Sequence, residues 1–356
     1  MVDRNRLLII SMIILGIIGV LGTYLAYNTP NSPQNGHITD MIGRNVAVPG
    51  EINRVASLSY SVTVQIFMLA PKKMIGWDSN RTEAANRYMP PQYSKLPVMG
   101  GGKKDANYES YLSQNPDIVF VGHGGSAEDV NRIQQKFGNL PLLDVEGDNN
   151  VTNITPSIKF MGTVLQEQNK SEELISFYNK VLQEVKPIAN SIPDSEKKRV
   201  YYARDPTGLM TNPAGASHTQ LIELCGGINV AQVPITKGSV GVSMEQVIKW
   251  NPDVIIASDS SFYNNIYSDP VWQNIKAVKE KQVYLVPNSP FNWFESPPGA
   301  NVIIGIPWTA KVLYPERYTA LDLKNLTKEF YSNFYHYNLT DEEVSNILIS
   351  SGLKEF

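Results

Sequence analysis

Cysteine and histidine are both scarce in this chain of 356 residues. Cys225 is the only cysteine, so no disulfide can form within the chain and no cysteine-based metal site is available. It lies in the apolar stretch 221–225, which ends at two glycines, and we predict that it is a small buried residue. The four histidines form no cluster and no H-E-x-x-H motif, which argues against a site for a free metal ion and against a metalloprotease.

The chain also lacks an excess of basic residues and the common nucleophile motifs. The net charge of −3 argues against a nucleic-acid partner, because such a partner usually needs a basic face. No Gly-x-Ser-x-Gly elbow is present. The stretch 100–104 (GGGKK) departs from the phosphate-loop pattern, since Lys104 replaces the hydroxyl residue and Pro97 the first glycine. We therefore read 100–104 as a turn and predict no catalytic residue.

One long hydrophobic run is present, at the N-terminus. Residues 7–27 are uncharged, and 21 residues are enough to cross a bilayer. Arg4 and Arg6 precede the run, which predicts a cytoplasmic N-terminus and an extracytoplasmic remainder. We expect residues 1–27 to be an uncleaved anchor, with a cleaved signal peptide as the alternative. Residues 28–36 (NTPNSPQNG) are expected to be a flexible tether.

A helix–strand unit occurs twice, with its copies 136 residues apart. Glu109 and Glu245 each stand seven residues before a Pro-Asp pair, and a short apolar run follows at once. In both copies the apolar residues around the glutamate form one stripe at helical spacing. The proline then ends the helix, and the apolar run predicts a strand buried on both faces. A duplicated unit in the two halves indicates two similar lobes with a cleft between them.

The remaining patterns support two lobes joined by one helix. The length suits two domains, and apolar residues at helical spacing predict a long helix from Ser171 to about Asn190. We expect a hairpin around Gly43, and a capping box in which Thr340 is followed by Glu343. Short strands are predicted at 54–58, 74–77, 118–121, 140–145, 200–203, 254–257 and 283–287. The expected lobes are 37–168 and 192–356, with the connecting helix at 169–191.

Four segments, in their order and spacing, resemble a known family. Residues 38–46 (ITDMIGRNV), 54–58 (RVASL), 115–119 (NPDIV) and 221–231 (LIELCGGINVA) are similar to class III solute-binding proteins of ATP-driven (ABC) importers for iron chelates, cobalamin and related metal complexes. The resemblance implies two Rossmann-like α/β lobes that are bridged by one long helix and enclose the ligand. It also implies that Glu109 and Glu245 meet arginines of the transmembrane permease, although they could instead be ordinary solvated carboxylates.

The function implied by the resemblance is that of a monomeric, extracytoplasmic binding protein without enzymatic activity or intrinsic cofactor. It would deliver a metal chelate of the iron–siderophore type to the permease, while a separate subunit hydrolyses ATP. Haem, a corrinoid, a nickel chelate and molybdate or tungstate are alternative ligands. A chelatase-like enzyme and a binding module of a surface sensor are alternative functions.

The loops after the strands supply the candidate ligand groups, because α/β proteins bind ligands at the carboxyl ends of their strands. Arg204 is the candidate for gripping an oxyanion, with an ion pair to a local acid as its alternative role. His123, in a glycine-rich loop, is a candidate hydrogen-bond donor or metal ligand, or a plain loop residue. Aromatic and amide groups, which could equally brace their loops, complete the predicted site: Tyr60, Trp77, Asn292, Trp293 and Phe294.

Overall fold

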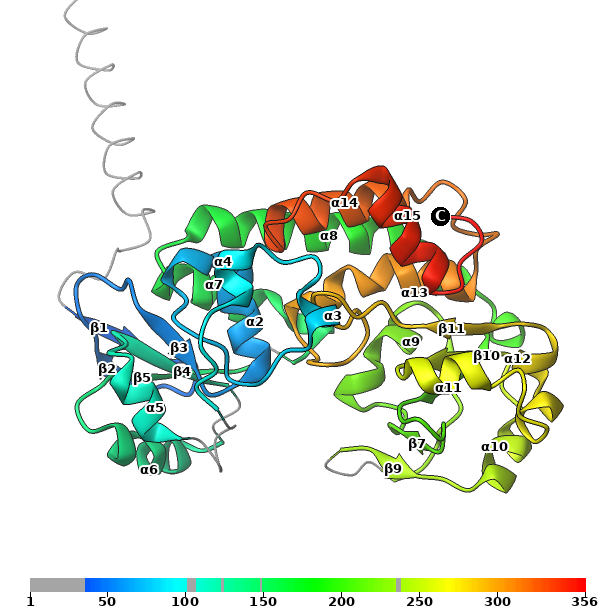
Figure 1. Ribbon diagram of the computed structural model, residues 1–356, viewed down its shortest axis with the longest axis horizontal. Helices are drawn as coiled ribbons and strands as arrows, with labels where there is room; N and C mark the ends of the chain where they lie inside the picture. The colour runs from blue at the N-terminus through cyan, green and yellow to red at the C-terminus, as the bar shows by residue number, and fades with distance from the viewer. Residues whose placement is uncertain (1–35, 101–106, 123–124, 148, 235–237) are drawn as a thin grey trace, which may run out of the picture.

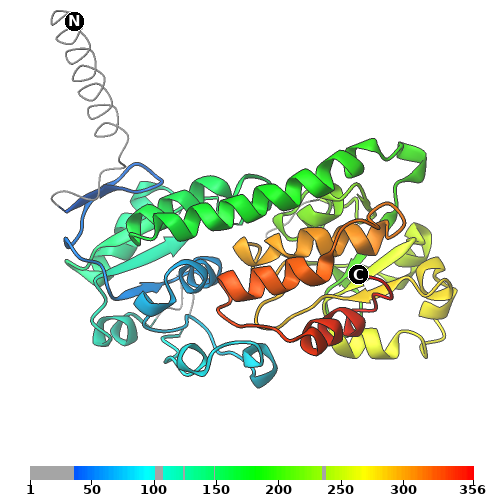
Figure 2. The same cartoon turned by 90° about the horizontal axis from the view of Figure 1, so that it is seen from above.

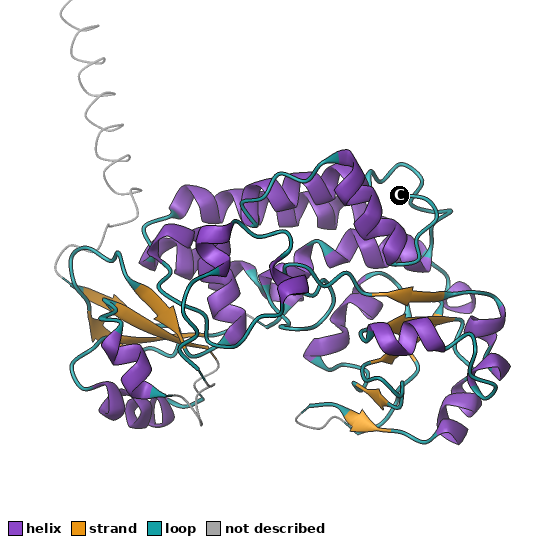
Figure 3. Cartoon of the chain, in the orientation of Figure 1, coloured by secondary structure: helices purple, strands orange, loops and turns teal. Residues whose placement is uncertain are grey.

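The computed structural model describes residues 36–100, 107–122, 125–147, 149–234 and 238–356. Two groups of strands lie toward opposite ends of the molecule, and helices connect them along one side (Figure 1, Figure 3). The N-terminal lobe holds a parallel sheet of order β3 (Val55–Ser57), β4 (Ile118–Gly122) and β5 (Leu142–Val145). The predicted α/β class with two lobes is confirmed.

The C-terminal lobe repeats this plan with four parallel strands in the order β11, β10, β6, β8. They are β6 (Arg199–Ala203), β8 (Ile228–Asn229), β10 (Val254–Ala257) and β11 (Val283–Leu285). β4 and β10 are buried along their whole length. Their continuous apolar runs suit strands that are covered on both faces.

Helix α8 (Gln168–Ser191) runs along the length of the molecule and links the two lobes (Figure 2). It packs against α7 (Thr155–Val164) and α13 (Gly305–Leu313). Helix α14 (Leu323–Phe334) lies beside it, where Lys180 Nζ is 2.8 Å from a carboxylate oxygen of Glu329. The long helix predicted from its apolar spacing is confirmed. The lobe boundaries at residues 168 and 192 stay a prediction.

The other elements are short. The helices are α2 (Tyr60–Leu69), α3 (Glu83–Asn86), α4 (Pro91–Ser94), α5 (Tyr108–Ser113), α6 (Ala127–Phe137), α9 (Gln220–Leu224), α10 (Met244–Trp250), α11 (Ser260–Asn265), α12 (Lys276–Lys279) and α15 (Asp341–Ser350). Of these, α2, α6, α9, α11 and α12 pack against the strands. Two antiparallel pairs join β1 (His37–Thr39) to β2 (Asn45–Ala47) and β7 (Met210–Thr211) to β9 (Val240–Gly241). The hairpin around Gly43, the capping box of Thr340 and the burial of Cys225 are confirmed.

The duplicated unit is present in both lobes, as α5–β4 and α10–β10. Each helix begins with a side-chain cap, in which Asn107 accepts a hydrogen bond from the Ser110 amide and Ser243 from the Gln246 amide. An asparagine stands in the left-handed region after each helix, with φ of 48° at Asn115 and 39° at Asn251. The two copies therefore share their helix starts and their helix ends.

The aspartate of each Pro-Asp pair ties its strand to the start of the neighbouring strand. Asp117 accepts hydrogen bonds from the amides of Asn53 and Arg54 at 2.7 and 2.8 Å. Asp253 accepts one from the Arg199 amide at 2.9 Å and pairs with Lys276 at 2.7 Å. The Pro-Asp pairs are thus structural, because they set the start of pairing between the central strands.

The segment 74–77 differs from its prediction as a strand. It makes only isolated bridges, from Met74 to Val55 and from Trp77 to Val98. The amide of Ile75 donates to Val55 of β3, whereas the amide of Trp77 donates to Pro97. The segment is therefore bonded to β3 at one end and to a loop at the other, and it does not form a regular strand of the sheet.

In the described part of the chain, no helix combines the length and the apolar character needed to cross a membrane. The predicted anchor (1–27) and all of the predicted tether except Gly36 lie outside the described residues.

Replacing either aspartate of the repeat should destabilise the protein. We expect Asp117→Ala and Asp253→Ala each to lower the free energy of unfolding by about 1–2 kcal/mol, because each leaves backbone amides without their acceptor. Urea denaturation measures the change. Glu172→Ala, on the exposed face of α8, is the control and should change stability by less than about 0.5 kcal/mol. Variants as stable as the control would contradict the assigned role.

Candidate ligand-binding site

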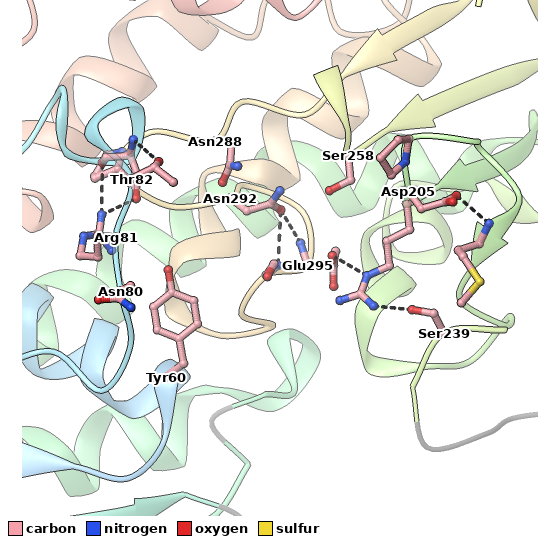
Figure 4. Close-up of a pocket in the computed structure, with 16 residues that line it drawn as sticks. Tyr60, Asn80, Arg81, Thr82, Asp205, Ser239, Ser258, Asn288, Asn292 and Glu295 are labelled. Atoms are coloured by element: carbon pink, nitrogen blue, oxygen red, sulfur yellow. Dashed lines mark hydrogen bonds and ion pairs between the residues drawn. The ribbon is translucent and has the colours of Figure 1, made fainter. Parts of the chain in front are cut away.

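A cleft of about 510 Å³ lies between the lobes and is lined mainly by polar side chains (Figure 4). The N-terminal lobe contributes Tyr60, Asn80, Arg81, Thr82 and Ala85. The C-terminal lobe contributes Arg204, Asp205, Pro206, Met210, Ser239 and Ser258. The segment that follows β11 contributes Asn288, Pro290, Asn292, Glu295 and Ser296.

The cleft lies where the parallel strands end, as the sequence predicted. Tyr60 follows β3, Arg204 follows β6, and Ser258 follows β10. Tyr60 is also the first residue of α2, whose N-cap Ser59 makes no side-chain cap. The positive end of this helix therefore lies at the cleft wall.

Arg204 is held in place by two neighbours in the cleft wall. Its Nε donates to Glu295 Oε1 at 3.1 Å, and its Nη1 donates to the hydroxyl of Ser239. Burial acts to lower the pKa of Arg204, but Glu295 and Tyr202 together outweigh this and raise the pKa above its ordinary value. The side chain of Arg204 is still 37 % exposed, so the oriented guanidinium remains open to the cleft. The predicted pairing with a local acid is present, and the acid is Glu295.

Asn292 lines the cleft, but its side-chain oxygen accepts hydrogen bonds from the loop that carries Glu295. Its Oδ1 accepts hydrogen bonds from the amides of Phe294 and Glu295 at 2.9 and 2.8 Å. On the far side of Glu295, His218 Nε2 lies 3.8 Å from Oε2. Burial lowers the pKa of His218, partly opposed by Glu295, so the imidazole is mostly neutral at pH 7. Glu295 is thus held through Oε1 by Arg204, while its Oε2 is buried and makes no hydrogen bond within the described part of the chain.

Arg81 is a cleft residue that the sequence reasoning missed. Its guanidinium lies over the rings of Trp77 and Phe291, at 4.5 and 4.7 Å from their centroids. Its Nη2 donates to the carbonyl of Pro290 at 2.7 Å, so it also connects the N-terminal lobe to the segment after β11. The sequence feature that could have predicted Arg81 as a cleft residue is its place in the loop after the predicted strand 74–77.

Two acidic groups beside Arg81 have shifted pKa values. Burial raises the pKa of the Tyr60 phenol, with Arg81 opposing the shift, so Tyr60 is a neutral hydroxyl donor at pH 7. Burial raises the pKa of Asp78 to about 6, against the lowering effect of its hydrogen bonds and of Arg81. Asp78 is 5 % exposed and lies outside the lining of the cleft.

Three aromatic side chains predicted for the ligand are placed in the core instead. Trp77, Trp293 and Phe294 are 1, 0 and 2 % exposed. The indole of Trp293 donates to Tyr331, and the ring of Phe294 lies 4.9 Å from that of Tyr202. Because protein covers these rings, they offer no face to a ligand in this structure, and their alternative role of bracing the fold applies. His123 lies outside the described residues.

Glu109 and Glu245 are both exposed and lie away from the cleft lining. Each is the second residue of its helix, α5 or α10, and both helices lie on the side of the molecule opposite α8 (Figure 1). A hydrogen bond with the Ser243 hydroxyl lowers the pKa of Glu245. Among the described residues, no group of three or more His, Cys, Asp and Glu side chains could hold a metal ion.

Two α/β lobes, one long connecting helix and a polar cleft between the lobes define a bilobed solute-binding protein. A family model described as "Periplasmic binding protein" matches residues 55–290, so the chain belongs to this family. It is 29 % identical over 326 residues to the molybdate-binding protein MolA of Haemophilus influenzae, covering 84 % of this chain and 90 % of MolA.

Solved structures agree with this assignment. An ABC transporter solute-binding protein from Sulfurospirillum deleyianum is 29 % identical, with a TM-score of 0.79 and coverage of 88 % of this chain and 99 % of the other. The molybdate-bound structure of MolA is 25 % identical, with a TM-score of 0.71 and coverage of 85 % and 99 %. The chain is thus a substrate-binding protein of an ABC transporter, and in MolA a metal compound is bound as the ligand.

The buried carboxyl group of Asp78 should make stability depend on pH. Its pKa is about 6 in the folded protein and about 3.9 when unfolded, so the folded state holds its proton longer and loses stability as pH rises from 4 to 6. We expect Asp78→Asn to raise the free energy of unfolding by on the order of 1–3 kcal/mol at pH 7.5, with little effect near pH 4.

Urea denaturation at the two pH values measures the effect of Asp78→Asn. The exposed Glu172→Gln serves as the control for loss of a carboxylate without burial. An Asp78→Asn variant that is less stable than wild type at pH 7.5, or that differs equally at both pH values, would contradict the assignment.

Proposed function

We propose that this protein captures an oxyanion of the molybdate or tungstate type and delivers it to an ABC permease. The observation that carries the proposal is that Arg81 and Arg204, from opposite lobes, line one polar cleft. Two guanidinium groups on opposing walls suit a compact anion with oxygen atoms on several sides. The similarity to MolA, whose name states that it binds molybdate, supports the same ligand class.

The neighbouring groups of the cleft support an anion as well. Tyr60 supplies a hydroxyl donor, and the uncapped N-terminus of α2 supplies backbone amides and the positive end of a helix. Glu295 carries the opposite charge, but its Oε1 is engaged by Arg204 and the residue is 2 % exposed. It therefore orients Arg204, and the ion pair offsets part of the carboxylate's charge at the cleft.

An iron–siderophore complex, expected from the sequence, is less well supported. That expectation depended on aromatic faces for a bulky chelate, and Trp77, Trp293 and Phe294 are buried. The lining consists mainly of amides, hydroxyls and charged groups, which suit a small, hydrogen-bonded anion. We therefore rank molybdate and tungstate before siderophores, haem, corrinoids and nickel chelates.

Two further parts of the function rest on the sequence. Residues 1–27 would anchor the protein in the membrane with the lobes outside the cytoplasm, and residues 28–36 would be the tether. Glu109 and Glu245 would dock the two lobes onto basic residues of the permease. Their exposure, and the position of both helices opposite α8, support this role.

Titration calorimetry with molybdate and tungstate tests the ligand. We expect binding by the wild type and an affinity about tenfold or more weaker in Arg204→Ala, because a charged hydrogen-bond donor is lost. Arg204→Lys should restore only part of the affinity, since lysine keeps the charge without the planar fork. Arg132→Ala, which removes an exposed guanidinium of α6, is the control and should bind as wild type. No binding of either oxyanion would refute this ligand class.

Charge reversal tests the docking role. We expect Glu109→Arg together with Glu245→Arg to abolish ligand uptake by the reconstituted transporter, because like charges would then face each other, while ligand affinity stays unchanged. Uptake by vesicles and calorimetry are measured in parallel. Glu172→Arg on α8 is the matched control. Normal uptake by the double variant, or loss of its ligand affinity, would refute the docking role.

A further inference from the structure

The two copies of the repeated helix each expose one large apolar side chain at the same place. Leu112 on α5 is 39 % exposed, and Ile248 on α10 is 46 % exposed. Each stands three residues after the glutamate of its helix, which puts it beside that glutamate on the same helix face. An acidic and an apolar group are therefore paired twice, once on each lobe.

Exposure of an apolar side chain at the same position of both copies is less ordinary than exposure of a single apolar residue. Among the described residues, six large apolar side chains are exposed, and two of the six occupy equivalent positions of the repeat. The residues immediately before them, Tyr111 and Val247, are fully buried. Each helix thus packs one apolar residue into the core of its own lobe and exposes the next apolar residue on the surface. Scattered apolar residues on a surface are ordinary, but a matched pair at repeated positions indicates a shared contact.

The C-terminal member of the pair lies in a groove of about 650 Å³. Apolar side chains from three segments line the groove: Leu209, Met244, Ile248, Phe262, Val271 and Trp272. Two carboxylates, Glu245 and Asp269, belong to the same lining. A groove with apolar walls and acidic groups fits an apolar side chain that is flanked by a basic residue.

We propose that Leu112 and Ile248 are apolar contacts for the permease, and that the groove beside Ile248 takes an apolar side chain from it. The proposal rests on the docking role proposed above for Glu109 and Glu245. Equivalent contacts on two lobes fit a partner that presents the same contact twice. A second copy of this chain fits less well, because matching acidic patches would then bring like charges together.

Salt separates the two kinds of contact. Ion pairs at an exposed interface weaken as salt screens them, whereas burial of apolar surface does not weaken in this way. Docking through carboxylates alone would disappear at high salt. Docking that also uses Leu112 and Ile248 keeps a salt-resistant part.

The test measures binding of the full-length protein to its ABC permease–ATPase complex in lipid nanodiscs, at about 0.1 and 0.5 M salt. We expect Leu112→Ser with Ile248→Ser to weaken docking about tenfold or more at both salt concentrations. The matched control is Ile349→Ser, which removes a 59 % exposed side chain from α15 and should dock as wild type. Molybdate binding and the melting temperature of all variants verify that the cleft and the fold are intact.

Three other outcomes would overturn the inference about Leu112 and Ile248, and a fourth would concern the ligand only. Wild-type docking by the double variant, with docking lost in Glu109→Arg/Glu245→Arg, would refute the apolar contacts and leave the charged ones standing. Equal loss in Ile349→Ser would show that the effect is unspecific. A concentration-dependent dimer of the wild type that the double variant abolishes would assign the patches to a second copy of this chain. Failure to bind molybdate with docking unchanged would refute the proposed ligand alone.

Discussion

The parallel pairing of the strands is the constraint on which the cleft depends. Parallel strands all leave their sheet at the same edge, so the residues that follow them are brought together even when they are far apart in the chain. Arg204 and Ser258, which follow the paired strands β6 and β10, meet in this way, and Tyr60, which follows β3 of the other sheet, lines the same cleft from the opposite lobe. The aspartates of the repeat support this arrangement, because Asp117 and Asp253 hold the beginnings of the neighbouring strands in register. A local hydrogen bond at one end of each sheet thus helps to determine the site at its other end.

The charged side chains of the cleft are held in position by neighbouring residues, each of which is itself held by another. Asn292 shapes the loop that carries Glu295, and Glu295 in turn orients Arg204. On the opposite wall, aromatic rings and the carbonyl of Pro290 hold Arg81. Both arginines are therefore positioned by the fold before any ligand arrives, which lowers the entropy cost of binding.

The proposed ligand contacts and the proposed partner contacts lie on different surfaces of the same lobes. The loops after the strands face the cleft, while the first turns of α5 and α10 carry the exposed glutamates on the side opposite α8 (Figure 1). Because α8 and its neighbours connect the lobes on the other side, neither surface is interrupted by the connection. With this separation, a substitution in the cleft that changes ligand preference would leave the proposed partner contacts intact.

The sequence alone determined the features that depend on local pattern: the buried strands, the long helix α8, the duplicated unit and the place of Arg204 after a strand. Tertiary structure decided which side chains the cleft exposes. Trp77, Trp293 and Phe294 are covered by rings from distant segments, and Arg81 reaches the cleft because its loop contacts Pro290, 209 residues away in the chain. Contacts between distant segments are properties of the packed molecule, and periodicity along the chain does not encode which loop side chains they cover.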